Sequence, residues 1–202
     1  MTLWLAADPL GLASQSKSRQ ALLQAAGITP EAIPADIDER GIQAASGLTD
    51  PSAIGALLAR AKAAHIAASK PGRVVVGADQ TLSLQGKLFS KPKGRAQAAD
   101  QLRQLSGGTH ELHSAIAVAR DSDILFEHVS VARMTMRRLS DDFIARYLDA
   151  AGDAVTTSVG AYQLEGLGSH LFERIEGDHF TILGLPLLPL LGFLRHARLV
   201  AE

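Results

Sequence analysis

Residues 73–81 hold the acid around which the chemistry of this chain can be built. They read Arg-Val-Val-Val-Gly-Ala-Asp-Gln-Thr, and the three consecutive β-branched residues predict a strand that is buried on both faces. We expect this strand to leave the sheet at Asp79, because ligands of open α/β sheets bind outside the carboxyl ends of strands. The alternative is that Asp79 only caps the next turn.

Serine and basic side chains gather just before the first predicted helix, residues 20–26. Ser14, Ser16 and Arg19 stand in this turn together with Lys17. Backbone N–H groups at a helix N-terminus and nearby cations can hold a phosphate group. Taken alone, the stretch is more simply explained by N-capping through Ser16, since it is neither a Walker loop nor a glycine-rich fingerprint.

Further charged residues lie at three other places. Residues 36–39 contain three carboxylates, which must either face water or meet a cation. Lys62 stands on a helix predicted over residues 51–69, where a solvated position is the simplest interpretation. Lys91 precedes a proline shortly after the buried strand, so it could point back at Asp79 or lie on the surface.

Composition excludes several classes of protein. The chain has 202 residues, a formal net charge of −1 and 47% hydrophobic residues, which fits a globular domain and gives no sign of nucleic-acid binding. It has no cysteine, hence no disulfide or thiolate zinc site. The apolar N-terminal stretch has no basic segment and is broken at Asp8, so we expect no signal peptide. No apolar run approaches the roughly 20 residues of a membrane span.

The rest of the sequence predicts alternating strands and helices. Strands are expected at residues 10–13, 32–34, 73–78, 111–119, 124–136 and 171–176, with a hairpin over residues 81–89 that turns near Gln85. Helices are expected at residues 20–26, 51–69, 94–105, 141–151 and 186–197. The seven histidines show no metal-ligand spacing.

Taken in order, these pieces resemble the Maf family, nucleoside triphosphate pyrophosphatases first associated with septum formation. The family's Leu-Ala-Ser-x-Ser-Pro-Arg-Arg corresponds to residues 12–19, its Asp-Glu to residues 38–39, its Lys-Ala to residues 62–63 and its Gly-Ala-Asp-Thr to residues 77–80. Its Lys-Pro, Ser-Gly-x-x-His, Gly-Ala-Tyr-x-x-x-Gly, Gly-Asp and Gly-Leu-Pro are similar to residues 91–92, 106–110, 160–166, 177–178 and 184–186. The resemblance covers nearly the whole chain.

The resemblance implies a fold, a reaction and a location. The fold would be α/β and Maf/ITPase-like, with an elongated mixed sheet flanked by helices. Residues 1–202 would form a single Maf-like domain of two lobes with a central cleft. The chain would hydrolyse the α–β phosphoanhydride of normal or modified nucleoside triphosphates in the cytoplasm, as a house-cleaning enzyme. Mg²⁺ or Mn²⁺ would assist, no nucleic-acid or membrane partner is expected, and a homodimer is left open.

The resemblance also assigns roles to residues. Asp79 would accept the proton of the attacking water, with Glu39, Lys62 and Lys91 as the other catalytic residues. Glu39 and Asp79 would ligate the metal ion. The substrate phosphates would be bound by Ser14, Ser16 and Arg19.

Three residues depart from the commonest family pattern. Ser18, Gln80 and Glu165 replace the usual Arg, Thr and Gln at positions that select the nucleobase. These departures bring the sequence nearer to the branch that acts on 7-methyl-GTP than to the dTTP/UTP branch. Alternatively, Glu165 caps a turn and faces solvent. Two other functions stay open: a nucleotide-binding regulator of cell division with little turnover, and hydrolysis at the terminal phosphate.

Overall fold

The chain divides into two compact units. In the computed structural model, which describes residues 3–201, unit 1 comprises residues 3–80, 114–130 and 183–201, and unit 2 comprises residues 81–113 and 131–182. Strands β3 (Val75–Leu84), β5 (Thr109–Arg120) and β6 (Asp123–Met136) contribute residues to both units.

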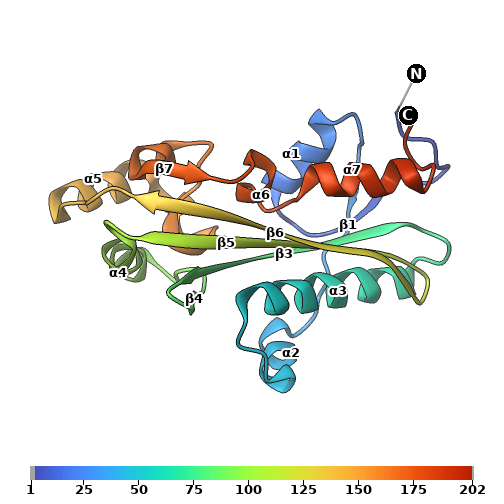
Figure 1. The fold of residues 1–202 in the computed structure, drawn as a ribbon, viewed down its shortest axis with the longest axis horizontal. Helices are drawn as coiled ribbons and strands as arrows, with labels where there is room; N and C mark the ends of the chain where they lie inside the picture. The colour runs from blue at the N-terminus through green and yellow to red at the C-terminus, as the bar shows by residue number, and fades with distance from the viewer. Residues whose placement is uncertain (1–2, 202) are drawn as a thin grey trace. The chain divides into compact units, whose positions relative to one another are not determined.

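One mixed sheet carries all the strands. Within residues 3–201 it has seven strands in the order β2-β1-β3-β5-β6-β7, and β4 pairs with β3 (Figure 1). The four short strands are β1 (Gly11–Ala13), β2 (Glu31–Ala32), β4 (Lys87–Phe89) and β7 (Phe172–Glu176). β1 runs parallel to β2 and β3, whereas β4 and β7 pair antiparallel with β3 and β6. The mixed sheet and its flanking helices confirm the predicted α/β class.

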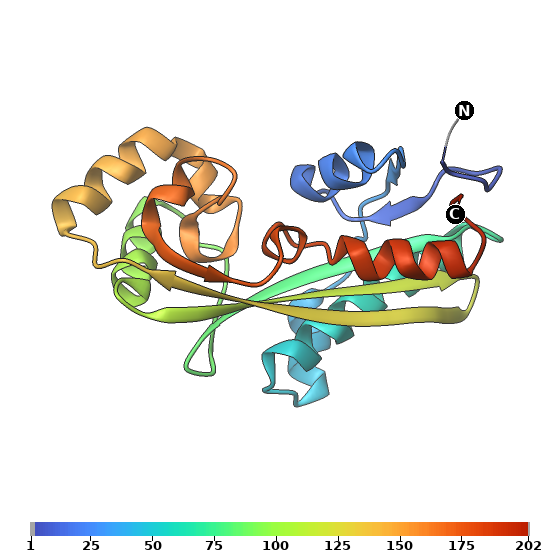
Figure 2. The ribbon, with the colours of Figure 1, turned by 45° about the horizontal axis from the view of Figure 1, so that its top comes forward.

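Helices cover both faces of the sheet in unit 1. They are α1 (Lys17–Ala25), α3 (Pro51–Ser69) and α7 (Leu187–His196), whereas α2 (Glu39–Ser46) packs against α3. α3 lies against one face, and α1 and α7 lie against the other (Figures 1 and 2). Strand β3 is therefore buried from both sides here, as its run of valines predicted.

Small residues bring α3 unusually close to β3. A Cβ at Gly77 would stand 2.1 Å from the carbonyl oxygen of Ala59 and 2.6 Å from the nitrogen of Ala63, so no larger residue fits there. Ala59 and Ala63 belong to α3 and are fully buried. The helix backbone therefore rests directly on the strand, which places Lys62 of α3 beside Asp79, two residues after Gly77.

Unit 2 contains the remaining helices. They are α4 (Arg95–Leu105), α5 (Asp141–Ala151), α6 (His179–Ile182) and the 3-10 helices η1 (Gly152–Thr156), η2 (Val159–Ala161) and η3 (Leu167–Leu171). α4 and α5 pack together, and the core between them and the strands includes Leu102, Met134, Ile144 and Leu148. The sequence did not predict the three 3-10 helices.

Strand β3 does not leave the sheet at Asp79, and that prediction was wrong. The strand continues to Leu84, because residues 82–84 pair antiparallel with β4. The hairpin turn near Gln85 is confirmed, with φ of 52° at Gln85 and 79° at Gly86. No helix within residues 3–201 is long and apolar enough to cross a membrane.

Candidate active site

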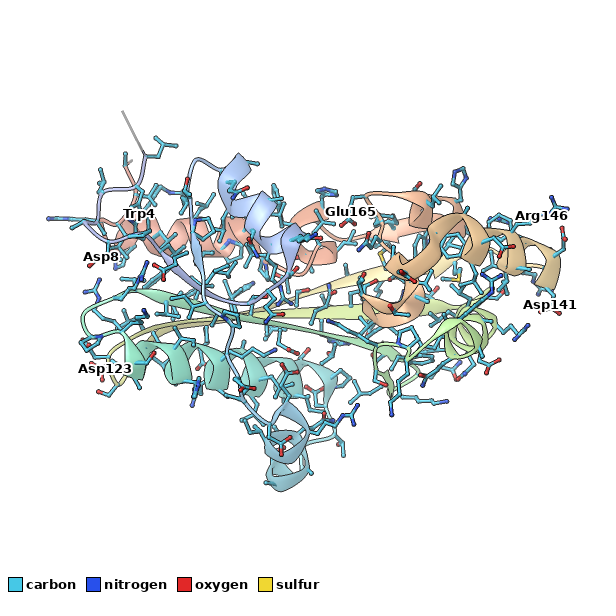
Figure 3. The ribbon with its side chains drawn as sticks, turned by 180° about the vertical axis from the view of Figure 1, so that it is seen from behind. Trp4, Asp8, Asp123, Asp141, Arg146 and Glu165 are labelled. Carbon is cyan, nitrogen blue, oxygen red and sulfur yellow. The ribbon has the colours of Figure 1, made fainter. Side chains whose placement is uncertain are left out.

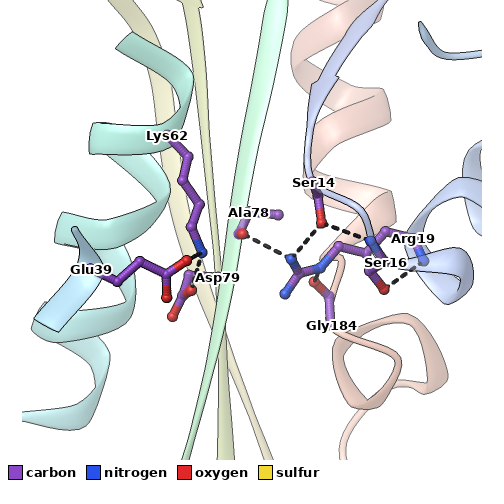
Figure 4. A network of polar contacts seen from close by, with 8 residues as sticks. All are labelled: Ser14, Ser16, Arg19, Glu39, Lys62, Ala78, Asp79 and Gly184. Atoms are coloured by element: carbon purple, nitrogen blue, oxygen red, sulfur yellow. Dashed lines mark hydrogen bonds and ion pairs between the residues drawn. The ribbon is translucent and has the colours of Figure 1, made fainter. Parts of the chain in front are cut away.

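Lys62 joins two carboxylates in unit 1. Its Nζ lies 2.6 Å from Asp79 Oδ1 and 2.8 Å from Glu39 Oε1 (Figure 4). The side chains of Lys62 and Asp79 are 11% and 10% exposed, whereas that of Glu39 is 48% exposed. Interpreting Lys62 as a solvated helix residue was therefore wrong. The structure brings together three of the predicted catalytic residues at the edge of a buried core.

Glu39 is held in place by the start of a helix that the sequence did not predict. The acidic stretch at residues 36–39 was interpreted as a turn, but α2 begins at Glu39 with Asp38 as its N-cap. Asp38 Oδ1 accepts a hydrogen bond of 3.0 Å from the backbone N–H of Gly41. A Cβ at Gly41 would lie 2.3 Å from the other carboxylate oxygen of Asp38. Glycine at residue 41 thus permits the cap that orients Glu39 in the first turn.

Arg19 ties three backbone segments together on the other side of β3. β1 pairs with β3 as far as Gly77, and beyond that point Arg19 Nη1 donates to the carbonyl oxygen of Ala78 at 2.9 Å. Arg19 Nε donates to the carbonyl oxygen of Gly184 at 2.7 Å, and Nη1 also donates to Ser14 Oγ at 3.0 Å. Among the described residues, Nη2 donates no hydrogen bond, so this nitrogen is the one left for a ligand.

The serine turn is a helix cap. Ser16 is the N-cap of α1, and its Oγ accepts from the backbone N–H of Arg19 at 3.4 Å. Ser14 Oγ accepts from the backbone N–H of Ser16 at 3.2 Å and also from Arg19 (Figure 4). The capping interpretation is confirmed, and α1 begins at Lys17, three residues before the predicted start. Each hydroxyl keeps its own hydrogen for donation.

Arg19 interacts through charge with the carboxylates of Asp79 and Glu39. Burial lowers the pKa of Arg19, and the negative charges of Asp79 and Glu39 act in the opposite direction. An arginine stays protonated in proteins under such conditions. Lys62 and Arg19 therefore present two cations and Asp79 and Glu39 two anions around one stretch of β3.

The carboxylates fit a metal site that depends on the substrate. Asp79 and Glu39 both reach one cation, the Lys62 ammonium group. Within residues 3–201 no group of three or more His, Cys, Asp or Glu side chains could hold a metal ion by itself. Mg²⁺ is usually held by one or two carboxylates together with substrate phosphates, and Asp79 and Glu39 would supply the two carboxylates.

Comparison with known proteins identifies the family. Residues 9–197 match the family described as Maf-like protein. The chain belongs to the Maf family. It is 67% identical over 201 residues to a nucleoside triphosphate pyrophosphatase of Bradyrhizobium diazoefficiens, with 100% of each chain covered. A protein of the same name from Rhodopseudomonas palustris is 64% identical over 201 residues, again with 100% of each chain covered. A 7-methyl-GTP pyrophosphatase of Rhizobium etli is 53% identical over 186 residues, which covers 91% of this chain and 94% of that protein.

The remaining residues with predicted roles in this Maf protein lie in both units. In unit 1, Ser18 is in the first turn of α1, and Gln80 Nε2 donates to the buried Ser114 Oγ at 2.9 Å. In unit 2, Lys91 is exposed between β4 and α4. Glu165, also in unit 2, is exposed in the loop between η2 and η3 (Figure 3). The roles of all four residues stay predictions.

Two backbone oxygens take part in the site, and no side-chain type in the sequence marks them. The carbonyl groups of Ala78 and Gly184 accept from Arg19, and every residue type has such a group. The Maf motifs that contain them, Gly-Ala-Asp and Gly-Leu-Pro, could have indicated where Arg19 would bind. A Cβ at Gly184 would lie 3.3 Å from Arg19 Nε, and its φ of 87° favours glycine.

Proposed function

We propose that this Maf protein is a nucleoside triphosphate pyrophosphatase. It hydrolyses the α–β phosphoanhydride. The oxygen of a water molecule forms a bond to the α-phosphorus, and the bond to the bridging oxygen breaks, so that pyrophosphate leaves with that oxygen. The observation that carries the proposal is the contact of Lys62 with both Asp79 and Glu39. The names of full-length relatives support it.

Asp79 is the proton acceptor in this proposal. Lys62 holds its Oδ1, while Oδ2 accepts no hydrogen bond among the described residues. That second oxygen would take the proton from the attacking water molecule. A positioned general base of this kind contributes about 10²–10⁴-fold to a rate. The position of Asp79 on a rigid strand, with one oxygen anchored, suits this role.

Glu39 and Asp79 would hold a divalent cation, Mg²⁺ or Mn²⁺, together with the phosphates of the substrate. Such an ion supplies charge neutralisation for the triphosphate and for the pyrophosphate that leaves. The chain adds its own cations for the same charge: Lys62 and Arg19 in unit 1 and, by family resemblance, Lys91. Ser14 and Ser16 would donate to phosphate oxygens through their hydroxyl hydrogens.

The specificity residues suggest a guanine-type substrate. A carboxylate only accepts hydrogen bonds, and guanine offers two adjacent donors, N1–H and the exocyclic amino group, which suit Glu165. Thymine and uracil present one N–H between two carbonyl oxygens, which Glu165 would meet unfavourably. We therefore propose GTP-type nucleotides, including the N7-methylated form, as substrates, with Gln80 and Ser18 completing the selection. We place this house-cleaning activity in the cytoplasm, where nucleoside triphosphates are made and used.

A single assay tests the reaction class. The protein is incubated with 7-methyl-GTP, GTP, dTTP or UTP in ¹⁸O-labelled water with Mg²⁺ or Mn²⁺, and the products are separated and weighed by mass spectrometry. We expect pyrophosphate and a nucleoside monophosphate that carries the label. Labelled inorganic phosphate together with an unlabelled nucleoside diphosphate would instead establish hydrolysis at the γ-phosphate. Nucleotide binding without turnover would favour a regulator of cell division.

The same assay tests substrate choice. We expect kcat/KM to be higher for 7-methyl-GTP and GTP than for dTTP and UTP, because the Glu165 carboxylate can accept from both donors of guanine but would face carbonyl oxygens of thymine and uracil. Glu165→Gln should narrow that difference, since an amide both donates and accepts. A clear preference of the unaltered protein for dTTP or UTP would contradict the assignment of Glu165.

A further inference from the structure

A buried histidine in unit 2 has no part in the reaction proposed above. His110, at the start of β5, has no exposed surface, and its Nε2 lies 2.7 Å from the hydroxyl oxygen of Tyr162, which is itself 5% exposed. Among the described residues, His110 Nδ1 has no hydrogen-bond partner. Burial lowers the pKa of His110 to about 4, so the ring is neutral at pH 7. The bond to Tyr162 is therefore the single polar contact of a desolvated imidazole in this part of the chain.

Tyr162 is fixed on several sides. Its ring meets Phe172 edge-on with 4.8 Å between centroids, and His110 is tilted against both rings. The carbonyl oxygen of Tyr162 accepts from Ser158 Oγ. The carbonyl oxygen of Ala161, the residue before it, accepts from the hydroxyl group of Tyr147 at 3.2 Å. Tyr162 thus joins a buried ring cluster to the loop that follows it.

That loop presents Glu165. The backbone N–H groups of Gly166 and Gly168 both donate to the carbonyl oxygen of Gln163, at 3.2 and 3.1 Å. A Cβ at Gly168 would lie 2.3 Å from that oxygen, so the 163–168 turn closes tightly on itself. Gln163 directly follows Tyr162, and Glu165 is exposed inside the turn (Figure 3). The turn thus begins one residue after Tyr162.

We propose that His110 and Tyr162 are positioning residues for nucleobase selection: the hydrogen bond between them fixes the 163–168 turn and so the direction of the Glu165 carboxylate. The inference rests on the proposed role of Glu165. It gives a role to the His of Ser-Gly-x-x-His and the Tyr of Gly-Ala-Tyr, two motif residues outside the chemistry. In this proposal both residues act through Glu165 and take no part in the chemical step.

The test uses Tyr162→Phe, which keeps the ring and removes the hydroxyl. The GTP-to-UTP ratio of kcat/KM should fall about threefold to tenfold, the range that one buried hydrogen bond gives when its free energy becomes a ratio. Ser83→Ala is the matched control, because it removes a buried hydroxyl that lies 3.1 Å from His113 Nε2. His113 is in β5, as is His110. We expect the control to keep the wild-type ratio. In a Glu165→Gln background, Tyr162→Phe should change the ratio no further.

A second measurement does not depend on catalysis. Amide hydrogen exchange of residues 163–168 in the intact protein should speed up in Tyr162→Phe and stay unchanged in Ser83→Ala. Unchanged exchange in Tyr162→Phe overturns the proposal. If Glu165→Gln alters the GTP-to-UTP ratio of kcat/KM, two results with Tyr162→Phe also overturn the proposal. They are an unchanged ratio and an equal loss of kcat/KM for both nucleotides. If the wild-type protein turns over no nucleotide, the proposed function is wrong. Amide hydrogen exchange then decides by itself whether the hydrogen bond between His110 and Tyr162 fixes the 163–168 turn.

Discussion

Removing the negative charge of Asp79 should separate catalysis from folding in a measurable way. In Asp79→Asn the Lys62 ammonium group loses its partner at 2.6 Å and keeps Glu39 at 2.8 Å. Breaking a buried pair on one side typically costs about 3–5 kcal/mol, because a charge is left uncompensated. Glu39 still neutralises part of that charge from a half-exposed position. We therefore expect Asp79→Asn to lower the free energy of unfolding by about 3 kcal/mol, the lower end of that range.

Two further variants bracket this value. Asp79→Asn combined with Lys62→Met removes both buried charges, and it should recover stability to within about 1 kcal/mol of wild type. Glu127→Gln makes the same acid-to-amide change in an exposed pair with Arg60, two residues before Lys62 on α3. This control should cost about 0.5 kcal/mol or less, since exposed ion pairs contribute little.

The assays are urea unfolding at pH 7 and pyrophosphate release. The fluorescence of Trp4, the one tryptophan of the sequence, reports on unit 1, and circular dichroism reports on the whole chain. Turnover of the folded protein should fall about 10²–10⁴-fold in both variants that lack Asp79 and stay unchanged in Glu127→Gln. An Asp79→Asn protein as stable as wild type would refute the buried pair. Near-normal turnover in that protein would remove Asp79 from the role of base.

Three further predictions concern the metal ion, Lys91 and His110. Excess chelator should abolish pyrophosphate release and added Mg²⁺ or Mn²⁺ should restore it, because the Glu39 and Asp79 carboxylates otherwise repel the triphosphate; full activity in chelator contradicts this. Lys91→Ala should lower kcat/KM about 10²-fold or more, by analogy with the loss of other transition-state charge contacts, without moving the urea midpoint, since the side chain is exposed; an unfolded variant whose folded fraction is fully active would make Lys91 structural. Burial lowers the pKa of His110 to about 4 from the ordinary value of 6.5. As the pH falls below about 6.5, His110 therefore binds a proton in the unfolded chain but not in the folded chain. Stability should thus fall by about 2 kcal/mol from pH 7 to pH 5. Urea midpoints should show this loss in wild type but not in His110→Phe.

Local sequence determined the elements and the chemical types at the site. The valine run before Gly77 required a strand covered on both faces. Asp50 before Pro51 marked the start of α3, and Ser16 marked the start of α1. These signals act over a few residues, through backbone sterics and capping hydrogen bonds, so they can be read without the fold. The ordered motifs added the family and, with it, the expected reaction.

Only the tertiary structure decided which charges meet. Lys62 and Asp79 are 17 residues apart in the chain, and Arg19 and Gly184 are 165 apart. Nothing local distinguishes Lys62 from a solvated lysine, because its burial comes from the close approach that Gly77 allows between α3 and β3. The sequence also predicted that β3 ends at Asp79, whereas the strand runs on through Asp79 into the hairpin with β4. Hydrophobic period and capping are local properties, whereas the partner of a charge is set by packing between distant segments.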